Sequence, residues 1–460
     1  MIDWLRVDGA RLIDSSGEEV VLRGFGIGGW LNMENFVTGF PGTESLQREA
    51  LRRALGEEGY ERFFRQFERT FFNDSDAEYL HSLGCNSVRL PINYRHLESD
   101  LRPFDIRQTG LDLIDNAVAC CKRHDLWVIL DLHALPGCQN QGWHSDNPTH
   151  WDSFWTQRHF QDRVIHLWEV LADRYKDEPA IAGYNPMNEP ADRQAGARLA
   201  AFYQRLEPAI RAADPRHVLF LDGNTYSTDF SMFTEALPNA VYTSHDYARP
   251  GMLPGACYPG EVEGQFFDFA KLESVFEQRT EFQRRSGTPI WIGEFGPQYC
   301  ADASINEQRL NLLSDQLRIY ADHGASWSLW TYKDMGLQGV RRLSPESPYA
   351  RRIESVTRAK ARLGTDLWGG SDQQIRYLLD PLMALFDREF PDFDPYPWGR
   401  ERWVATLFRH IMLGEPLVSQ FEACFRGMDD AAIDQCCSSF ECDHCIESAG
   451  LADLLRSHLH

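Results

Sequence analysis

Eight short apolar runs, rich in β-branched residues, recur along most of this chain and constrain its fold more than any other feature. They occupy residues 20–29, 85–92, 127–135, 181–190, 218–224, 241–247, 289–296 and 325–332. The segments between them place apolar residues three and four positions apart, as amphipathic helices do: 75–83, 109–124, 158–176, 194–213, 268–286 and 306–323. Strands that alternate with helices pair in parallel, and eight such units close a ring. The pattern therefore predicts an α/β fold, a (β/α)8 TIM barrel.

The chain divides near residue 345 into this barrel and a helical region. Residues 1–345 hold the eight units, a hairpin-like preface and inserted helices at 41–72. Beyond 345 the strand patterns stop, and six segments have helical patterns: 348–363, 371–389, 400–413, 416–426, 429–439 and 448–459. Trp368, Trp398 and Trp403 in this region offer more apolar surface than isolated short helices can bury. We therefore expect residues 346–460 to form a C-terminal helical appendage packed on the barrel.

The charge of the chain limits its partners. The formal net charge is −22 at pH 7, whereas nucleic acids and anionic membranes bind positive surfaces. No run approaches the roughly eighteen apolar residues that span a bilayer, so we expect no membrane insertion. The first residues lack a basic segment followed by an apolar one, which indicates a cytoplasmic protein unless a signal has been removed. A neutral substrate fits this composition best, and the oligomeric state stays open.

Eleven cysteines, an odd number in a long chain, are typical of a reducing compartment. The group Cys436, Cys437, Cys442, His444 and Cys445 contains one Cys-x-x-Cys spacing that could hold half of a zinc site. Its other two cysteines are adjacent, and the segment has a helical pattern. Buried thiols are therefore the favoured interpretation, with structural zinc as the alternative, and we expect no metal or organic cofactor.

Two of the apolar runs end in glutamates. Glu189 lies in the segment Tyr-Asn-Pro-Met-Asn-Glu-Pro over 184–190, and Glu294 lies in Trp-Ile-Gly-Glu-Phe-Gly-Pro over 291–297. A glutamate wedged between apolar residues, prolines and glycines is not a solvated surface charge. Two carboxylates presented from two strand ends are the minimum equipment for breaking a glycosidic bond.

Polar and aromatic residues close nearly every other strand. Because the C-terminal ends of barrel strands line one common site, the candidate substrate-binding residues are Arg89, His133, Asn188, Asn224, His245, Tyr247 and Trp330. Each has a simpler interpretation alone: Arg89 as the buried partner of any acid, His133 as a core histidine and Trp330 as core packing. Their coincidence at consecutive strand ends favours a site.

These motifs resemble those of the retaining glycoside hydrolases of family 5. The resemblance covers roughly residues 5–345. It rests on Asn188-Glu189-Pro190, Gly293-Glu294-Phe295-Gly296, Val88-Arg89-Leu90-Pro91, Asp131-Leu132-His133, His245-Asp246-Tyr247 and Trp330. It implies that Glu189 is the general acid/base and Glu294 the nucleophile.

Physical chemistry favours the same division of roles. Arg89 beneath Glu294, with a hydrogen bond from Tyr247, would stabilise a charged nucleophile. Glu189, framed by apolar neighbours, would have a raised pKa that suits an acid. Asn188 is placed to bind the 2-hydroxyl of the sugar, and a retaining pair should lie about 5 Å apart. His133 and His245 would fix neighbouring hydroxyls or the acid/base, and Trp330 would offer a ring face to the sugar.

A long polar loop follows the third strand. Its sequence over 135–140 resembles the exo-acting β-glucanase and β-glucosidase branches of the family, and Trp143 and His144 are candidate walls of the terminal-sugar subsite. An ordinary ordered loop is the simpler alternative. Together with the insertion at 41–72 and the appendage, this loop favours a pocket over an open groove. We therefore expect a retaining exo-acting β-glucosidase or β-glucanase.

Three alternatives stay open. An endo-acting β-glucanase or β-mannanase is disfavoured by the missing secretion signal, since polymers are cut outside the cell. A β-glucosidase of glycolipid or flavonoid glycosides is the second alternative, because the sequence does not identify the residues that bind the aglycone. A non-catalytic carbohydrate-binding barrel is the third, although such a protein would not need both glutamates together with Arg89, Asn188 and Tyr247.

Overall fold

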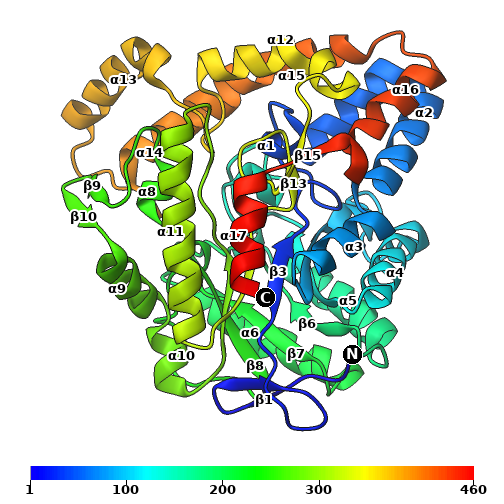
Figure 1. Cartoon of the computed structure of the whole chain (residues 1–460). Coiled ribbons are helices and arrows are strands. Elements are labelled where there is room, and N and C mark those ends of the chain that lie inside the picture. Colours follow the sequence, from blue (N-terminus) through cyan, green and yellow to red (C-terminus); the bar gives the residue numbers. More distant parts are fainter. Residues whose placement is uncertain (1, 460) are drawn as a thin grey trace.

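A closed parallel barrel forms the centre of the protein, in a computed structural model that describes residues 2–459 (Figure 1). Its strands are β3 (Arg23–Gly26), β4 (Ser87–Asn93), β5 (Trp127–Ala134), β6 (Ile181–Asn185), β7 (Val218–Asp222), β8 (Ala240–His245), β11 (Ile290–Glu294) and β12 (Ser326–Leu329). They pair in sequence order, and β12 closes the ring on β3. All eight predicted strands and the barrel are confirmed. The strands are shorter than the apolar runs because each run also includes residues of an adjoining loop.

Helices surround the barrel where the amphipathic patterns predict them. They are α3 (Asp74–Ser82), α4 (Gln108–Arg123), α5 (Arg158–Tyr175), α6 (Ala197–Ala213), α9 (Phe269–Arg279), α10 (Glu281–Ser286) and α11 (Ala303–Asp322). Several begin at side-chain caps: the Asn73 side chain accepts from the Ser75 amide, and Asp302 accepts from the Ser304 and Ile305 amides. Such caps satisfy amides that have no partner within the helix.

The N-terminal hairpin closes the lower end of the barrel. Strands β1 (Arg6–Asp8) and β2 (Arg11–Ile13) pair antiparallel. The backbone carbonyl of Asp3 accepts a hydrogen bond from the indole of Trp127, the first residue of β5. A separate apolar cluster lies here, formed by Leu5, Leu12, Leu22, Trp127, Ile129, Ala182, Val218, Phe220, Val241 and Trp291. The opposite, C-terminal end of the strands is therefore left for the site.

The insertion in the first connection is one long helix, α2 (Glu44–Phe71), interrupted at Gly56, where φ is 69°. A short helix, α1 (Asn35–Thr38), precedes it. The inner face of α2 carries Phe63, Phe64 and Phe67, all buried. These rings pack against the C-terminal region, since Phe425 contacts Phe63 and Phe440 contacts Phe67.

The C-terminal region is mainly helical and covers the upper end of the barrel beside α2 (Figure 1). It comprises α12 (Pro348–Leu363), α13 (Arg376–Glu389), α14 (Gly399–Thr406), the π-helical turn η5 (Leu407–Gly414), α15 (Glu415–Phe425), α16 (Asp430–Cys437) and α17 (Ala449–Leu459). The prediction that strands stop after 345 is wrong at β15 (Cys445–Glu447), which pairs with β14 (Arg341–Leu343). Three residues are too few for a strand pattern, and the partner strand lies about a hundred residues away in sequence.

Smaller elements complete the connections. The remaining strands are β9 (Gly260–Val262), β10 (Gln265–Phe267) and β13 (Lys333–Asp334). The remaining short helices are α7 (Asn224–Ser227), α8 (Arg249–Met252), η1 (Tyr94–His96), η2 (Trp143–Ser145), η3 (Ser153–Trp155), η4 (Gln373–Ile375), η6 (Ser438–Phe440) and η7 (Cys442–His444).

A buried lysine ties the three regions together. The Lys333 ammonium, fully buried, donates to the carbonyls of Phe71 and Phe440 and pairs with the Asp76 carboxylate at 2.8 Å. Its partners come from α2, α3 and the C-terminal region, so its burial depends on all of them.

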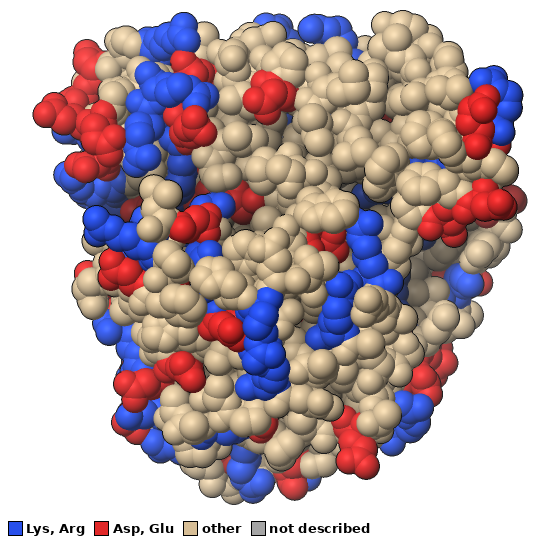
Figure 2. Space-filling view, turned by 180° about the vertical axis from the view of Figure 1, so that it is seen from behind, with Lys and Arg blue, Asp and Glu red and all other residues tan. Residues whose placement is uncertain are grey.

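Charged side chains of both signs lie on the surface. On the face seen in Figure 2, acidic and basic side chains are interspersed, and no extended area is basic. Among residues 2–459, no helix combines the length and apolar composition of a membrane span.

Candidate active site

The C-terminal ends of the strands bring most of the predicted residues together. Glu294 ends β11, His245 ends β8, and Trp330 directly follows β12. Glu189 lies four residues past β6 in a left-handed backbone conformation, with φ of 47°. A non-glycine residue held in that conformation costs free energy, and such residues cluster at functional sites.

Arg89 and Tyr247 hold Glu294. An Arg89 guanidinium nitrogen, Nη1, lies 2.5 Å from Glu294 Oε1, and the Tyr247 hydroxyl donates to Oε2 over 2.9 Å. Burial and the adjacent carboxylate raise the pKa of Tyr247 well above its ordinary value, so its hydroxyl keeps its proton. Both contacts require Glu294 to accept hydrogen bonds, as an ionised carboxylate does.

Arg89 also organises the neighbouring strands. Its Nη2 donates to Asn185 over 2.9 Å and to the Asn188 side-chain oxygen over 2.7 Å, and pairs with Asp131 at 3.1 Å. The Asn188 amide nitrogen therefore faces His133 Nε2, 3.1 Å away, while His133 Nδ1 lies 2.7 Å from Asp131. This fully buried arginine fixes the rotamers of residues on three strands.

Glu189 lies between two histidines. Its Oε1 is 2.7 Å from His245 Nδ1, and its Oε2 is 3.0 Å from His144 Nε2. Burial favours the neutral carboxyl, but hydrogen bonds from His144 and His245 outweigh it and hold the pKa of Glu189 below its ordinary value. The predicted apolar frame with a raised pKa is therefore wrong. The prolines and methionine beside Glu189 in sequence do not set its surroundings; two imidazoles from other loops do.

Asp222, at the end of β7, is a site residue that the sequence interpretation missed. Its Oδ2 accepts from the Glu189 backbone amide over 2.9 Å, and its Oδ1 accepts from the Asn185 side chain over 2.8 Å. Burial raises the pKa of Asp222 to about 6, against the opposing charges of His245 and Arg89. The signal available was a carboxylate as the last residue of an apolar strand.

Glu34, in the loop after β3, is the second missed residue. Its side chain is 8% exposed, its Oε1 has no hydrogen-bond partner, and that atom lies 3.6 Å from His133 Nε2. Trp330 stacks on the other side of His133, with ring centroids 5.4 Å apart and planes 2° from parallel. Glu34 therefore presents a free acceptor beside the aromatic wall.

Two predicted residues are placed differently. Asn224 accepts from the Asp192 amide and donates to its carbonyl, so both ends of its side chain brace the loop after Glu189 instead of facing a substrate. Trp143 is buried, and one face of its indole is covered by His410 of the C-terminal region. Its neighbour His144 does reach the centre of the site.

The two glutamates face each other across His245. One side-chain atom from each of Glu189, His245 and Glu294 lies within 4.8 Å of the other two. Within residues 2–459 this is the one group of three or more such residues that could hold a metal ion, and the C-terminal cysteines do not form another. Cys436, Cys437, Cys442 and Cys445 are buried free thiols, whereas His444 is exposed.

A (β/α)8 barrel that presents two facing carboxylates from its strand ends belongs, by geometry, to the class that hydrolyses glycosides. The family model for cellulase, glycosyl hydrolase family 5, matches residues 55–336, and the chain belongs to this family. It is a glycoside hydrolase by family, and its substrate is therefore a carbohydrate.

Known relatives cover different shares of the chain. A protein named beta-xylosidase from Phanerodontia chrysosporium is 42% identical over 99% of this chain and 98% of its own length. Endoglucanase C of Acetivibrio thermocellus is 24% identical, over 61% of this chain and 89% of its own length. The solved structure of endoglucanase Cel5A from Thermotoga maritima covers 69% of this chain and 91% of its own, with a TM-score of 0.51 and 21% identity, a likeness in fold.

Proposed function

We propose that this protein is a retaining, exo-acting β-glycosidase that removes one terminal sugar. The observation that carries the proposal is the separation of the carboxylates, with an oxygen of each within 4.8 Å of the other. Retaining pairs lie about 5 to 5.5 Å apart, whereas inverting pairs leave about 6.5 to 9.5 Å for a water molecule.

Glu294 acts as the nucleophile and Glu189 as the acid/base in this proposal. A Glu294 oxygen bonds to the anomeric carbon, and the bond to the leaving oxygen breaks as that oxygen takes a proton from Glu189. Water then gives a proton to Glu189 and displaces Glu294. The contacts of Glu294 with Arg89 and Tyr247 favour this assignment, since they support a charged carboxylate.

The sugar would lie among residues of several strands. Asn188 would bind the 2-hydroxyl next to the anomeric carbon, and Trp330 would offer its ring face. His133 and Glu34 are placed to meet hydroxyls further round the ring, because Glu34 Oε1 lies beside His133 and has no hydrogen-bond partner among residues 2–459. His245, between both glutamates, would position the acid/base.

A closed pocket suits removal of a terminal sugar. The loop over 136–150 is joined to the insertion and to the C-terminal region: the Ser45 amide at the start of α2 donates to Asp146, and His410 stacks on Trp143. These contacts gather three segments beside the site, which supports a pocket over an open groove. The relative named beta-xylosidase makes a β-xyloside the second candidate substrate, beside a β-glucoside.

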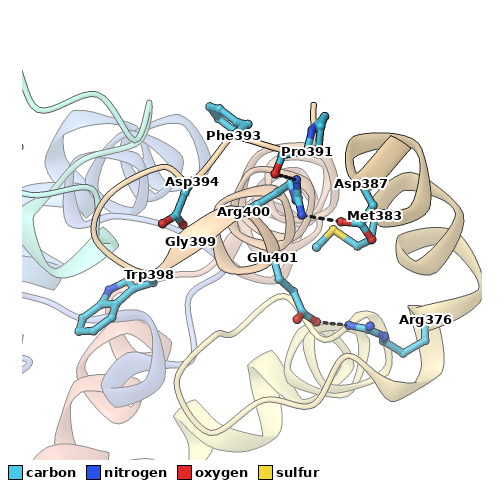
Figure 3. Close-up of a pocket in the computed structure, with 10 residues that line it drawn as sticks. All are labelled: Arg376, Met383, Asp387, Pro391, Phe393, Asp394, Trp398, Gly399, Arg400 and Glu401. Atoms are coloured by element: carbon cyan, nitrogen blue, oxygen red, sulfur yellow. Dashed lines mark hydrogen bonds and ion pairs between the residues drawn. The ribbon is translucent and has the colours of Figure 1, made fainter. Parts of the chain in front are cut away.

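Apolar surface near the opening favours an aglycone with apolar character. Eight of the thirteen exposed large apolar side chains lie between residues 377 and 412. A surface hollow of about 590 Å³ lies here, lined by the apolar side chains of Met383, Phe393 and Trp398 and by five charged residues, Arg376, Asp387, Asp394, Arg400 and Glu401 (Figure 3). Trp398 packs on Tyr226, which in turn contacts His144 in the site. These ring contacts link the hollow to the site, and exposed apolar side chains gathered on one surface are typical of binding surfaces.

The test combines two variants with a substrate panel. Glu294→Gln should lose activity by about a thousandfold or more with every leaving group. Glu189→Gln should lose about a hundredfold or more with methyl or octyl glycosides but little with a dinitrophenyl glycoside, and azide should restore part of the rate. Glu58→Gln, on an exposed part of α2, is the control.

The same panel decides the substrate. p-Nitrophenyl β-glucoside and β-xyloside compare the sugars, while octyl and methyl β-glucosides compare the aglycones. NMR of the first-formed anomer should show retention. An inverted product, or equal losses in Glu189→Gln for all leaving groups, would contradict the assignment of roles.

A further inference from the structure

The turn η2 carries two neighbouring rings: His144 contacts the catalytic site, and Trp143 contacts the C-terminal region. His144 points to the site and lies 3.0 Å from Glu189 Oε2. Trp143 points the other way and is 5% exposed. Because the two residues are adjacent in a single turn, a shift of one ring moves the other.

On one face, the Trp143 indole is covered by residues of η5. The His410 ring lies on the indole with centroids 3.6 Å apart and planes 13° from parallel. A Cβ added to Gly414 would come within 3.2 Å of the same indole, so only glycine leaves it undisturbed. These contacts clamp the turn against the C-terminal region.

His410 is itself firmly placed. The neighbouring Arg409 donates hydrogen bonds to the carbonyls of Gly364 and Asp366. The Asp366 carboxylate accepts from Asn35 and pairs with Lys360 at 3.0 Å. The clamp is therefore anchored to the barrel side of the molecule, through α1, as well as to its own region.

The position of His144 fixes one side of the Glu189 carboxyl. Asn140 accepts from the Gly142 amide and donates to the Glu189 carbonyl, and its amide nitrogen lies 3.0 Å from His144 Nε2. The same ring nitrogen lies 3.0 Å from Glu189 Oε2, and its hydrogen bond to that carboxylate lowers the pKa of Glu189. Held in this position, His144 orients the acid/base together with His245.

We propose that His410 is a positioning residue for the acid/base: through its stack on Trp143 it holds His144, and with it the Glu189 carboxyl, in place for proton transfer to the leaving group. This inference rests on the proposed function. It assigns the C-terminal region a part in proton transfer, not only in stability.

The test compares His410→Ala with His410→Phe, which keeps the stacked ring. In His410→Ala, kcat for a methyl or octyl glycoside should fall about tenfold, while the dinitrophenyl glycoside should change less than about twofold. Because the His144 contact lowers the pKa of Glu189, the alkaline limb of the kcat/KM profile should move to higher pH, and KM should change little. His410→Phe should restore both. His444→Ala, an exposed histidine of the same region, is the matched control.

A second variant tests the same contact without removing the His410 ring, in case His410→Ala fails to fold. Gly414→Ala pushes on the indole with one methyl group and should reproduce the leaving-group effect at unchanged thermal stability. Equal losses for both leaving groups with an unmoved pH profile, or no loss at all, would overturn the positioning role. If Glu189→Gln itself showed no leaving-group dependence, the proposed function would fail instead, so the two failures are distinguishable.

Discussion

Glu34 brings a buried carboxylate into the site, and its Oε1 has no hydrogen-bond partner among residues 2–459, although His133 Nε2 approaches it to 3.6 Å. Keeping such an acceptor is costly unless a ligand pairs with it. We predict that Glu34→Gln lowers kcat/KM about tenfold to a hundredfold, the value of a charge-assisted hydrogen bond of about 1.5 to 3 kcal/mol. Thermal stability should stay the same or rise. Steady-state kinetics and a melting curve measure both, and a stability loss with unchanged kinetics would contradict a substrate contact.

Single residues were the least predictable level of this site. Both Glu189 and Glu294 could be found from sequence because each interrupts an apolar run. Glu34 could not, since it belongs to a loop with no periodic pattern. The sequence pattern points to Asn224 and not to Asp222, because sequence order does not tell which of two nearby polar residues faces inward. The two histidines beside Glu189 come from distant loops, so only the fold shows that they outweigh burial.

At the scale of elements, the contact between η5 and the loop over 136–150 contains two facing histidines. Nε2 of His150 and Nδ1 of His410 lie 3.3 Å apart. Burial lowers the pKa of His150 to about 4 and lowers the pKa of His410 well below its ordinary value. At pH values between 6.5 and about 4, His150 binds a proton in the unfolded chain but stays neutral in the folded chain. The contribution of the neutral His150 to the free energy of unfolding is therefore fully present above pH 6.5 and is lost as pH falls toward 4.

We predict that His150→Leu removes much of this acid sensitivity. The folded His150 should account for on the order of 3 kcal/mol between neutral and acid pH, since one pKa unit corresponds to about 1.4 kcal/mol. Denaturant melts at pH 7.5 and pH 4.5 measure the difference. His444→Leu, at an exposed position, should behave as the wild type. A wild-type protein equally stable at both pH values would count against the prediction.

Elements were predictable where periodicity is long. The eight strands and their helices follow from repeated apolar spacing, and α2 follows from its phenylalanines. Strand β15 was missed because its three residues pair with a strand far away in sequence. The π-helical turn η5 has an ordinary helical pattern, and its role in covering Trp143 depends on packing alone.

At the scale of the whole molecule, the C-terminal region supports the barrel and both halves of the site. Trp368 packs on Tyr247, the donor to Glu294, with centroids 4.8 Å apart, while His410 packs on Trp143. We predict that a chain cut after Thr365 is unstable and loses activity by at least about a hundredfold. Exposing Phe63 and Phe67 of α2 alone should cost about 3 to 6 kcal/mol.

Coexpression of residues 366–460 as a separate chain provides the control, since it should restore soluble, active protein if packing is the cause. Solubility, melting temperature and turnover are the measurements. A truncated chain that is stable and fully active would refute the supporting role. Elemental analysis of the full chain separately tests the cysteines: one zinc per chain, lost with folding on chelation, would replace the interpretation as buried thiols.

The hairpin of β1 and β2 closes the barrel at the end where the strands begin, and its contact with Trp127 keeps it away from the carboxylates. Attachment to a solid support through this end would thus orient the catalytic opening outward. A protein immobilised there should turn over dissolved substrate as fast as the free protein, whereas coupling through the C-terminal region, at the opposite end of the barrel, should slow turnover (Figure 1).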